Sequence, residues 1–324
     1  MIGFYGFLQI KEYIVQEFDY DLSRTCDEIR PGYYHTETCM ETVPEAITAF
    51  LDGENTMQEK IKPILNGSAE TMLQSFYARA QYSKSKGHKF YDAKAVELVE
   101  KIDYDFDTAS KDSTMSNGVI ARTLVFDELV KAFIDENPDC TVVNIACGLD
   151  TRFYRMDNGK ITWYNVDLPE TIEVRNQIYG ESGRMSAIGI SAIDEAWAKE
   201  IKVRGKMLFI IEGLSMYLTK EENAQMLRII RENFDNAYVL MECLAKRWVS
   251  KEKIEKSIQG TGAKFVFGAD SFDDIKDIAG GFRKVMDDDI VRGMTAIFPA
   301  LKPFAWLSFV HKISQKILIF EKAV

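Results

Sequence analysis

Two periodicities of apolar positions divide most of the chain into helices and strands. Between residues 70 and 137 the apolar residues recur at helical spacing, and from residue 141 short apolar runs alternate with helical segments. The expected strands are 141–146, 161–166, 185–190, 207–213, 237–242 and 316–322. The expected helices are 71–85, 92–102, 117–137, 170–179, 192–201 and 220–234. This alternation predicts an α/β fold with a doubly wound, mostly parallel sheet.

The first 60 residues have a different character from the rest. Residues 8–22 show helical spacing, a turn is expected at Pro31-Gly32, and a second helix is expected to begin near Thr42. The pattern predicts a helical N-terminal extension, residues 1–60, followed by a larger domain, residues 61–324.

The most informative stretch begins at Thr141. The β-prone residues 141–146 lead into a small-residue turn at Cys147-Gly148, and the next strand ends on Asp167. In nucleotide-binding α/β units such a turn lets a ligand approach the backbone, and such an acid binds a ribose. The glycines do not follow the G-x-G-x-x-G pattern of a dinucleotide site, so a cofactor without phosphates fits better. S-adenosylmethionine is the common cofactor of this kind.

Three motifs in order and at consistent spacing then carry a resemblance. They are VVNIACGLDTRFYR, WYNVDLPE and LFIIEGLSMYL, and from about Ser68 to the C-terminus the chain resembles the leucine carboxyl methyltransferase family, in particular its bacterial small-molecule O-methyltransferase branch. The resemblance implies a Rossmann-like class I methyltransferase fold with an antiparallel last strand. It also implies S-adenosylmethionine as the cofactor and methyl transfer to a small-molecule carboxylate or hydroxyl.

The resemblance further implies which residues hold the tail of the cofactor. Arg79 and Arg122 would bind its carboxylate, because a guanidinium matches a carboxylate bidentately, with a surface ion pair as the alternative for each. Ala146, Cys147 and Gly148 would lie under the amino-acid tail and the ribose. Family members usually have glycine at the position of Ala146, so either its methyl group crowds the cofactor or the backbone needs no positive φ there.

Three acids follow strands or the turn and are expected at the same site. Asp150 would accept from the cofactor amine or cap the next helix. Asp167 would accept from both ribose hydroxyls or cap the helix after Pro169. Glu212 follows four apolar residues and would face the cofactor amine, since a buried acid is costly unless it is paired or faces a polar site.

The remaining expected contacts concern the adenine and the acceptor. Leu168 would pack near the adenine, and Ser191 stands where the family has an acid that contacts the adenine edge. Tyr217 would line the pocket in which methyl donor and acceptor meet, or belong to the core.

The reaction itself asks little of the enzyme beyond proximity and orientation. A carboxylate acceptor is already a nucleophile at neutral pH, whereas a hydroxyl benefits from a general base. No catalytic residue is assigned, because none of the histidines lies in a recognisable motif: His35, His88 and His311. A group of aromatic residues is expected in an apolar pocket wall or in the core: Phe298, Phe304 and Trp306.

Residues 1–54 resemble a fragment of the ADP-ribosylglycohydrolase family. The glycine- and aspartate-rich metal-binding segment of that family does not follow, since the chain continues NTMQEKIKPILNGSAE. We therefore expect no hydrolase activity and a helical cap or partner surface in its place.

Composition narrows the classes of partner. A net charge of −10 argues against a footprint for nucleic acid or an anionic membrane. Five cysteines without CxxC spacing predict reduced thiols in a cytoplasmic protein and no metal site. Two other function classes stay open: a non-catalytic S-adenosylmethionine-binding or scaffold protein, and an ADP-ribose-related enzyme. The sequence does not fix the oligomeric state.

Overall fold

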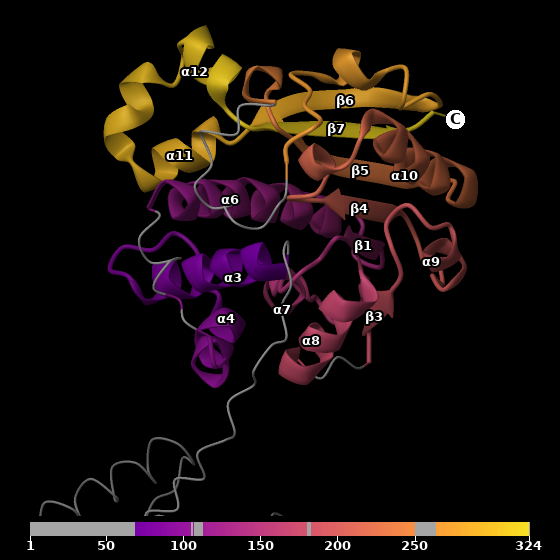
Figure 1. The fold of residues 1–324 in the computed structure, drawn as a ribbon, viewed down its shortest axis with the longest axis horizontal. Helices are drawn as coiled ribbons and strands as arrows, with labels where there is room; N and C mark the ends of the chain where they lie inside the picture. Colours follow the sequence, from indigo (N-terminus) through magenta and orange to yellow (C-terminus); the bar gives the residue numbers. More distant parts are fainter. Residues whose placement is uncertain (1–68, 105, 107–112, 180–182, 250–263, 324) are drawn as a thin grey trace, which may run out of the picture. The chain divides into compact units, whose positions relative to one another are not determined.

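Seven strands form one sheet in the order β3-β2-β1-β4-β5-β7-β6. The computed structural model of the chain describes residues 69–104, 106, 113–179, 183–249 and 264–323 (Figure 1). Its strands are β1 (Thr141–Ile145), β2 (Thr162–Asp167), β3 (Met185–Gly189), β4 (Met207–Ile211), β5 (Ala237–Cys243), β6 (Phe282–Asp289) and β7 (Lys316–Lys322). The expectations for residues 1–58 lie outside the described residues.

The strand directions place most carboxyl ends on one edge of the sheet. Strands β1 to β5 pair in parallel, and Ile145 lies beside both Val166 and Ile211. Strand β7 is antiparallel to β5 and to β6, so β6 again runs in the direction of β5. The predicted Rossmann-like class I methyltransferase architecture, with a mostly parallel sheet and an antiparallel last strand, is confirmed. We refer to the edge at which β1 to β6 end as the carboxyl edge.

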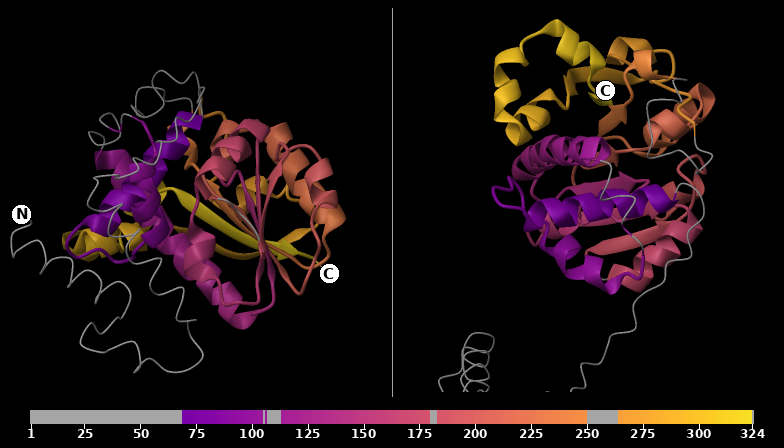
Figure 2. Two further views of the ribbon diagram at one scale, coloured as in Figure 1. Left: turned by 90° about the horizontal axis from the view of Figure 1, so that it is seen from below. Right: turned by 60° about the vertical axis from the view of Figure 1, so that its left-hand side comes forward.

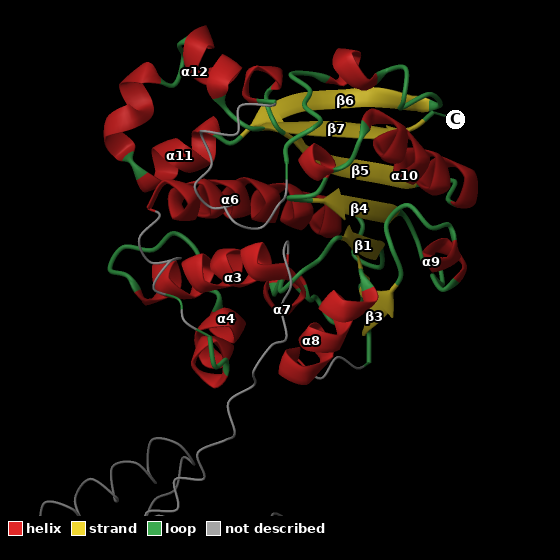
Figure 3. Ribbon diagram, in the orientation of Figure 1, coloured by secondary structure: helices red, strands yellow, loops and turns green. Residues whose placement is uncertain are grey.

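Helices cover both faces of the sheet (Figures 2 and 3). The α-helices are α3 (Ala69–Lys84), α4 (Ala93–Leu98), α6 (Ser113–Glu136), α7 (Arg152–Met156), α8 (Pro169–Tyr179), α9 (Ala196–Lys199), α10 (Lys220–Asn233), α11 (Val291–Ile297) and α12 (Ser308–Ile313). The 3-10 helices are η2 (Val99–Lys101), η3 (Ser215–Tyr217), η4 (Lys246–Trp248), η6 (Phe272–Ile275) and η7 (Pro299–Phe304).

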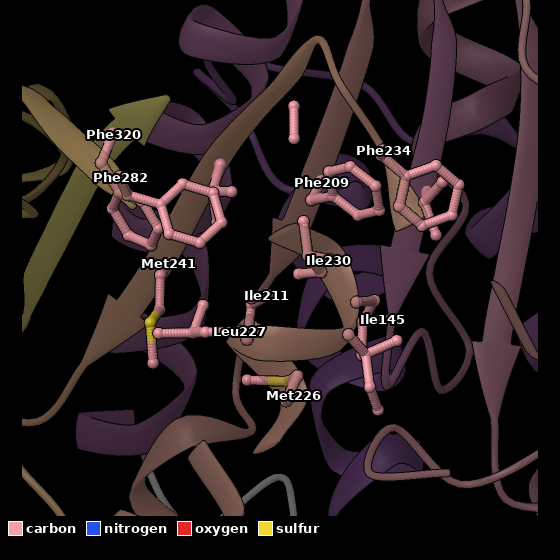
Figure 4. Packing of buried hydrophobic residues seen from close by; sticks show 14 of the residues in the cluster. Ile145, Phe209, Ile211, Met226, Leu227, Ile230, Phe234, Met241, Phe282 and Phe320 are labelled. Atoms are coloured by element: carbon pink, nitrogen blue, oxygen red, sulfur yellow. The ribbon is translucent and has the colours of Figure 1, made fainter. Parts of the chain in front are cut away.

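The central strands are buried on both faces, which explains their continuous apolar sequences. On one face Phe209 packs with Phe234 and Ile230 of the α10 region (Figure 4). On the other face Leu208 packs with residues of α6 such as Val125. Burying an aromatic or aliphatic side chain of this size contributes about 1.5–3 kcal/mol, so the two layers hold the strand ends in a fixed arrangement.

The expected helix 192–201 is shorter in the structure, because its first residues form a turn. The side chain of Asp194 accepts from the backbone N–H of Ala196 at 2.9 Å, and the indole of Trp197 donates to the carbonyl of Ala192 at 3.2 Å. These local bonds compete with helical ones, so α9 begins only at Ala196.

The sequence pattern is less regular between residues 268 and 315 and predicts no element there, but the region holds η6, β6, α11, η7 and α12. Strand β6 has the sequence FRKVMDDD, pairs only with β7 at the edge of the sheet and has four of its eight residues exposed. An edge strand of this kind has neither an apolar run nor a clear alternation, so its sequence does not indicate a strand.

Candidate active site

The turn after β1 contains two residues with positive φ. Ala146 has φ 55° and Gly148 has φ 47°. A Cβ at Gly148 would lie 3.2 Å from the Cβ of Met72, so the turn also needs the small residue for space. An L-residue in this conformation costs about 1–2 kcal/mol, so Ala146 holds a conformation that glycine adopts freely. The backbone at Ala146 therefore does use positive φ.

Asp167 joins the ends of β1 and β2. Its Oδ2 accepts from the backbone N–H of Gly148, and its Oδ1 accepts from the backbone N–H of Leu168, both at 2.8 Å. Burial raises the pKa of Asp167 above the usual aspartate value, although these two backbone bonds and one from the Thr171 side chain oppose the shift. Leu168 is exposed beside it, and Ser191 is half-buried in the turn after β3. Four of the expected positions thus lie on one stretch of the carboxyl edge.

Arg122 of α6 lies between the acids that follow β4 and end β5. Its Nε donates to Glu212 at 2.7 Å, and its Nη1 donates to both carboxylate oxygens of Glu242 at 3.1 and 3.2 Å. Its Nη2 hydrogen-bonds to none of the residues that the structure describes, and the side chain keeps 14% of its surface exposed. A Cβ atom added to Gly213 would lie 3.9 Å from both Nη atoms of this guanidinium.

Glu242, the residue before the last one of β5, also belongs to the site, although the sequence pattern did not single it out. It is fully buried and accepts from Arg122 and from the backbone N–H of Gly213 at 2.6 Å. Burial raises the pKa of Glu242, and the nearby Arg122 opposes that shift. Burial also disfavours the Arg122 cation, but Glu242 and Glu212 outweigh burial and raise the pKa of Arg122.

Arg152 of α7 is the centre of the charged groups and was also missed. It is 2% exposed and makes three ion pairs, with Asp127 at 2.7 Å, with Asp150 at 2.7 Å and with Glu212 at 2.8 Å. Asp150 accepts in addition from Asn144 within β1, at 2.9 Å. Burial acts to raise the pKa of Asp150, but the guanidinium of Arg152 and two further arginines hold it below the usual range.

Arg79 hydrogen-bonds to the backbone that follows the turn after β1. Its Nη2 donates to the carbonyl of Leu149 at 2.7 Å, and its Nε donates to the buried Asp92 at 3.2 Å. Arg155 connects Asp92 to Asp127 with bonds of 3.0 and 2.9 Å. The side chain of Arg79 is therefore directed to the backbone of the turn and to a carboxylate, and its expected role as a ligand of the cofactor carboxylate stays a prediction.

These ion pairs form one connected network that is almost entirely buried. Its members alternate in sign, with one carboxylate more than arginines: Arg79, Arg122, Arg152, Arg155, Asp92, Asp127, Asp150, Glu212 and Glu242. Buried charges need such pairing, because each would otherwise lose several kcal/mol of hydration. The network thus favours one further cation among its partly exposed acids, Asp150 and Glu212.

Tyr217 lies in η3, directly after β4, and its ring is 5.2 Å from the ring of Phe265. Ser215 of the same turn donates to the carbonyl of Glu242 at 2.5 Å. Tyr217 is half-buried, so it belongs to the carboxyl edge and not to the sealed core.

Neither of the two described histidines, His88 and His311, is hydrogen-bonded to this network. Nδ1 of His311 is 2.6 Å from Oδ2 of Asp289 at the end of β6, and the ring of His88 contacts that of Tyr91. The aromatic residues near the C-terminus are exposed, and so the expectation that they could be core is wrong: Phe298, Phe304 and Trp306. Their segment leaves the sheet between β6 and β7 and exposes its apolar side chains.

No helix among the described residues is long and apolar enough to cross a membrane. No cluster of three or more His, Cys, Asp or Glu side chains in the described part of the chain is placed to hold a metal ion.

Comparison with known proteins places the chain in a family. The model of the leucine carboxyl methyltransferase family matches residues 67–231. The chain is 33% identical over 208 residues to the tetracenomycin polyketide synthesis O-methyltransferase TcmP of Streptomyces glaucescens, a match that covers 63% of this chain and 76% of that protein. It is 29% identical over 198 residues to the S-adenosyl-L-methionine-dependent methyltransferase dpfgK of Gibberella zeae, covering 56% of this chain and 66% of that protein.

The fold has solved counterparts as well. A protein of Thermobifida fusca, provisionally described as a methyltransferase, superimposes with a TM-score of 0.50 at 14% identity, covering 76% of this chain and 94% of that one. The resemblance of residues 1–54 to a hydrolase fragment lies outside the described residues and outside the matched family model. By the extent of the family match, the chain belongs to the leucine carboxyl methyltransferase family.

Proposed function

We propose that this methyltransferase binds S-adenosylmethionine at the carboxyl edge and transfers its methyl group to an oxygen of a small molecule. The observation that carries the proposal is the position of Asp167, which is tied to the backbone of the positive-φ turn by Gly148 and ends the second strand. A carboxylate at that place is the ribose ligand of nucleotide-binding α/β folds. The relative from Gibberella zeae is an S-adenosyl-L-methionine-dependent methyltransferase, which supports the same cofactor.

The residues present fit the chemistry of this cofactor. Its tail carries a carboxylate and an ammonium group. Nη2 of Arg122 has no hydrogen-bond partner among the described residues and suits the carboxylate of the cofactor. The partly exposed Glu212 and Asp150 suit its ammonium group. The network has one carboxylate in excess, so a bound cation restores its balance. When bound, the cofactor supplies an electrophilic methyl group.

Oxygen is the acceptor atom that the observations favour. The relative from Streptomyces glaucescens is an O-methyltransferase of polyketide synthesis, and this supports an oxygen acceptor on a small molecule. None of the described histidines joins the charged network, so the site is better suited to an acceptor that is already ionised, such as a carboxylate or an acidic phenol. The work of the chain's own residues is then to orient the reactants and to exclude water around Tyr217.

Calorimetry with the product cofactor S-adenosylhomocysteine tests the proposal. Asp167→Asn keeps the shape of the side chain but removes its charge. Because charge-assisted hydrogen bonds are worth about 1.5–3 kcal/mol, affinity should fall roughly 10- to 100-fold. Asp235→Asn is the matched control, since Asp235 is an exposed partner of Lys322 far from the turn in sequence, and it should bind as the wild type does.

The same titration has a defined pH dependence. Ribose hydroxyls stabilise the carboxylate form of Asp167, so the cofactor lowers its raised pKa and binding releases a proton. Affinity should therefore fall as the pH decreases, beginning above the ordinary aspartate pKa of about 3.9, and Asp167→Asn should lose this dependence. Equal affinity of the wild type and Asp167→Asn would disprove the assignment. Binding without transfer to any oxygen acid would indicate a non-catalytic binding protein.

A further inference from the structure

The segment between β6 and β7 carries an unusual concentration of exposed apolar side chains. We name residues 290–315 the β6–β7 excursion; it contains α11, η7 and α12. Five of its large apolar side chains are exposed: Phe298 (38%), Leu301 (41%), Phe304 (54%), Trp306 (78%) and Phe309 (60%). The last three are the most exposed large apolar side chains of the described residues. These five side chains lie within twelve consecutive residues, and a concentration of exposed apolar side chains on a protein surface often marks a binding site.

The charge of the excursion is opposite to that of the chain. The excursion has no aspartate or glutamate, whereas three cationic side chains occur in it: Arg292, Lys302 and Lys312. The whole chain has a net charge of −10. Lys302 and Lys312 are exposed among the aromatic residues. The excursion therefore suits a partner that is apolar and negatively charged.

The direction of the strands places the excursion on the carboxyl edge. It leaves the sheet at the end of β6 and returns at the start of β7, where Asp289 pairs with Lys316 and Lys316 pairs with Cys243. Cys243 follows Glu242, which binds Arg122. The excursion thus begins at the end of β6, two strands from β5, and ends at the start of β7, next to β5. Both points lie in register with Cys243 near the end of β5.

Helix α11 seats the excursion against the cofactor site. The Cβ position of Gly293 is 2.1 Å from the carbonyl oxygen of Ala121, so the two helices touch through their backbones at the residue before Arg122. Figure 2 shows α11 lying along α6 at this end of the sheet. Arg292 adds an ion pair to Glu128 of α6 at 3.1 Å. The base of the excursion is therefore fixed against α6 beside Arg122, and the segment with the exposed aromatic residues follows directly after α11 in the chain.

We infer that the β6–β7 excursion recognises the methyl acceptor, and that this acceptor is an aromatic small molecule carrying a negative charge. The inference rests on the proposed function and names the acceptor class of the same site. Flat aromatic groups stack on Trp306 and the phenylalanines, and the lysines attract a carboxylate or phenolate. Two like-charged excursions would repel each other, so the charge distribution disfavours a symmetric contact between the excursions of two copies.

The test uses methyl transfer from labelled S-adenosylmethionine to hydroxynaphthoates, naphthoates and aliphatic acids of equal charge. Aromatic acids should be methylated in preference to aliphatic ones. Trp306→Ala with Phe309→Ala should raise KM for the best aromatic acid at least tenfold with kcat within about twofold, and Lys302→Glu with Lys312→Glu should raise it by a similar factor. Val203→Ser with Lys202→Glu is the matched control, because both residues are exposed at the opposite edge before β4.

The outcomes separate this inference from the proposed function. S-adenosylhomocysteine affinity is measured on every variant and should be unchanged. A wild type that does not bind the cofactor contradicts the proposed function. A wild type that binds it but methylates no aromatic acid, or excursion variants with wild-type KM, overturns the inference alone. Loss of self-association or of vesicle binding in these variants, with KM unchanged, would assign the excursion to an interface or a lipid surface.

Discussion

Two regions share the carboxyl edge of the sheet and are built in opposite ways. In the first, around the turn after β1, the charged side chains that form the network are paired, and none is more than 14% exposed. In the second, the β6–β7 excursion, large apolar side chains are 38–78% exposed and lysines stand among them. The first region suits a ligand of one fixed shape, and the second suits a ligand that varies.

The two constructions have different energetic consequences. The buried ion pairs contribute little net stability over an apolar core, but removal of one partner leaves an uncompensated charge. The exposed aromatic residues contribute little to folding, because most of their area stays in water. Mutations should therefore damage the fold in the first region and selectivity in the second.

The largest effect is expected for Arg152→Met in the first region. The change leaves Asp127, Asp150 and Glu212 without their shared cation, and breaking buried pairs of this kind costs about 3–5 kcal/mol. Urea unfolding measures the loss. Lys131→Met on α6 is the control, since its pair with Asp135 is exposed and should be worth about 0.5 kcal/mol or less. Similar losses for the two variants would show that the network does not depend on Arg152.

The next effect is at the contact that joins the two regions. Gly293→Ala places a Cβ against the backbone of Ala121, and overpacking of this kind costs about 1–3 kcal/mol. It should also raise KM for the acceptor, because α11 must shift away from α6. Gly118→Ala on α6 is the matched control: nothing lies near its Cβ position, and alanine should stabilise the helix by about 0.5–1 kcal/mol. Tolerance of Gly293→Ala would show that the packing of α11 can relax.

The same contrast explains which parts of the fold were predictable. Strands β1, β2, β4 and β5 are apolar runs because both of their faces are buried, so pattern alone located them to within two residues. Strand β6 lies at the edge with a polar sequence, and the excursion after it has no helical period, so neither was predicted. Tertiary context decides such segments, and it leaves little trace in the local pattern.

The site divides in a similar way. Asp167 and Glu212 were found because each ends or follows an apolar strand, which is a local signal. Arg152 and Glu242 were missed because each has a partner that is distant in sequence: Arg152 and Glu212 are 60 residues apart, and Arg122 and Glu242 are 120 residues apart. The signals present were an acid within an apolar strand and the two arginines of DTRFYR, but only the folded chain shows that Arg152 pairs with Glu212 and that Arg122 pairs with Glu242.

The smallest effect on stability is expected at Ala146, an uncharged residue of the first region whose backbone has positive φ. Ala146→Gly removes the cost of positive φ, about 1–2 kcal/mol, but adds about 0.5–1 kcal/mol of backbone entropy loss on folding. The free energy of unfolding should therefore rise by up to about 1 kcal/mol, with S-adenosylhomocysteine affinity equal or slightly higher. Gly159→Ala is the reciprocal control, because Gly159 has φ 79° and open space around its Cβ position, and alanine there should cost about 1 kcal/mol. If Ala146→Gly destabilises the protein instead, the methyl group of Ala146 supports the turn by packing, and the charged network is not the only feature that fixes this region.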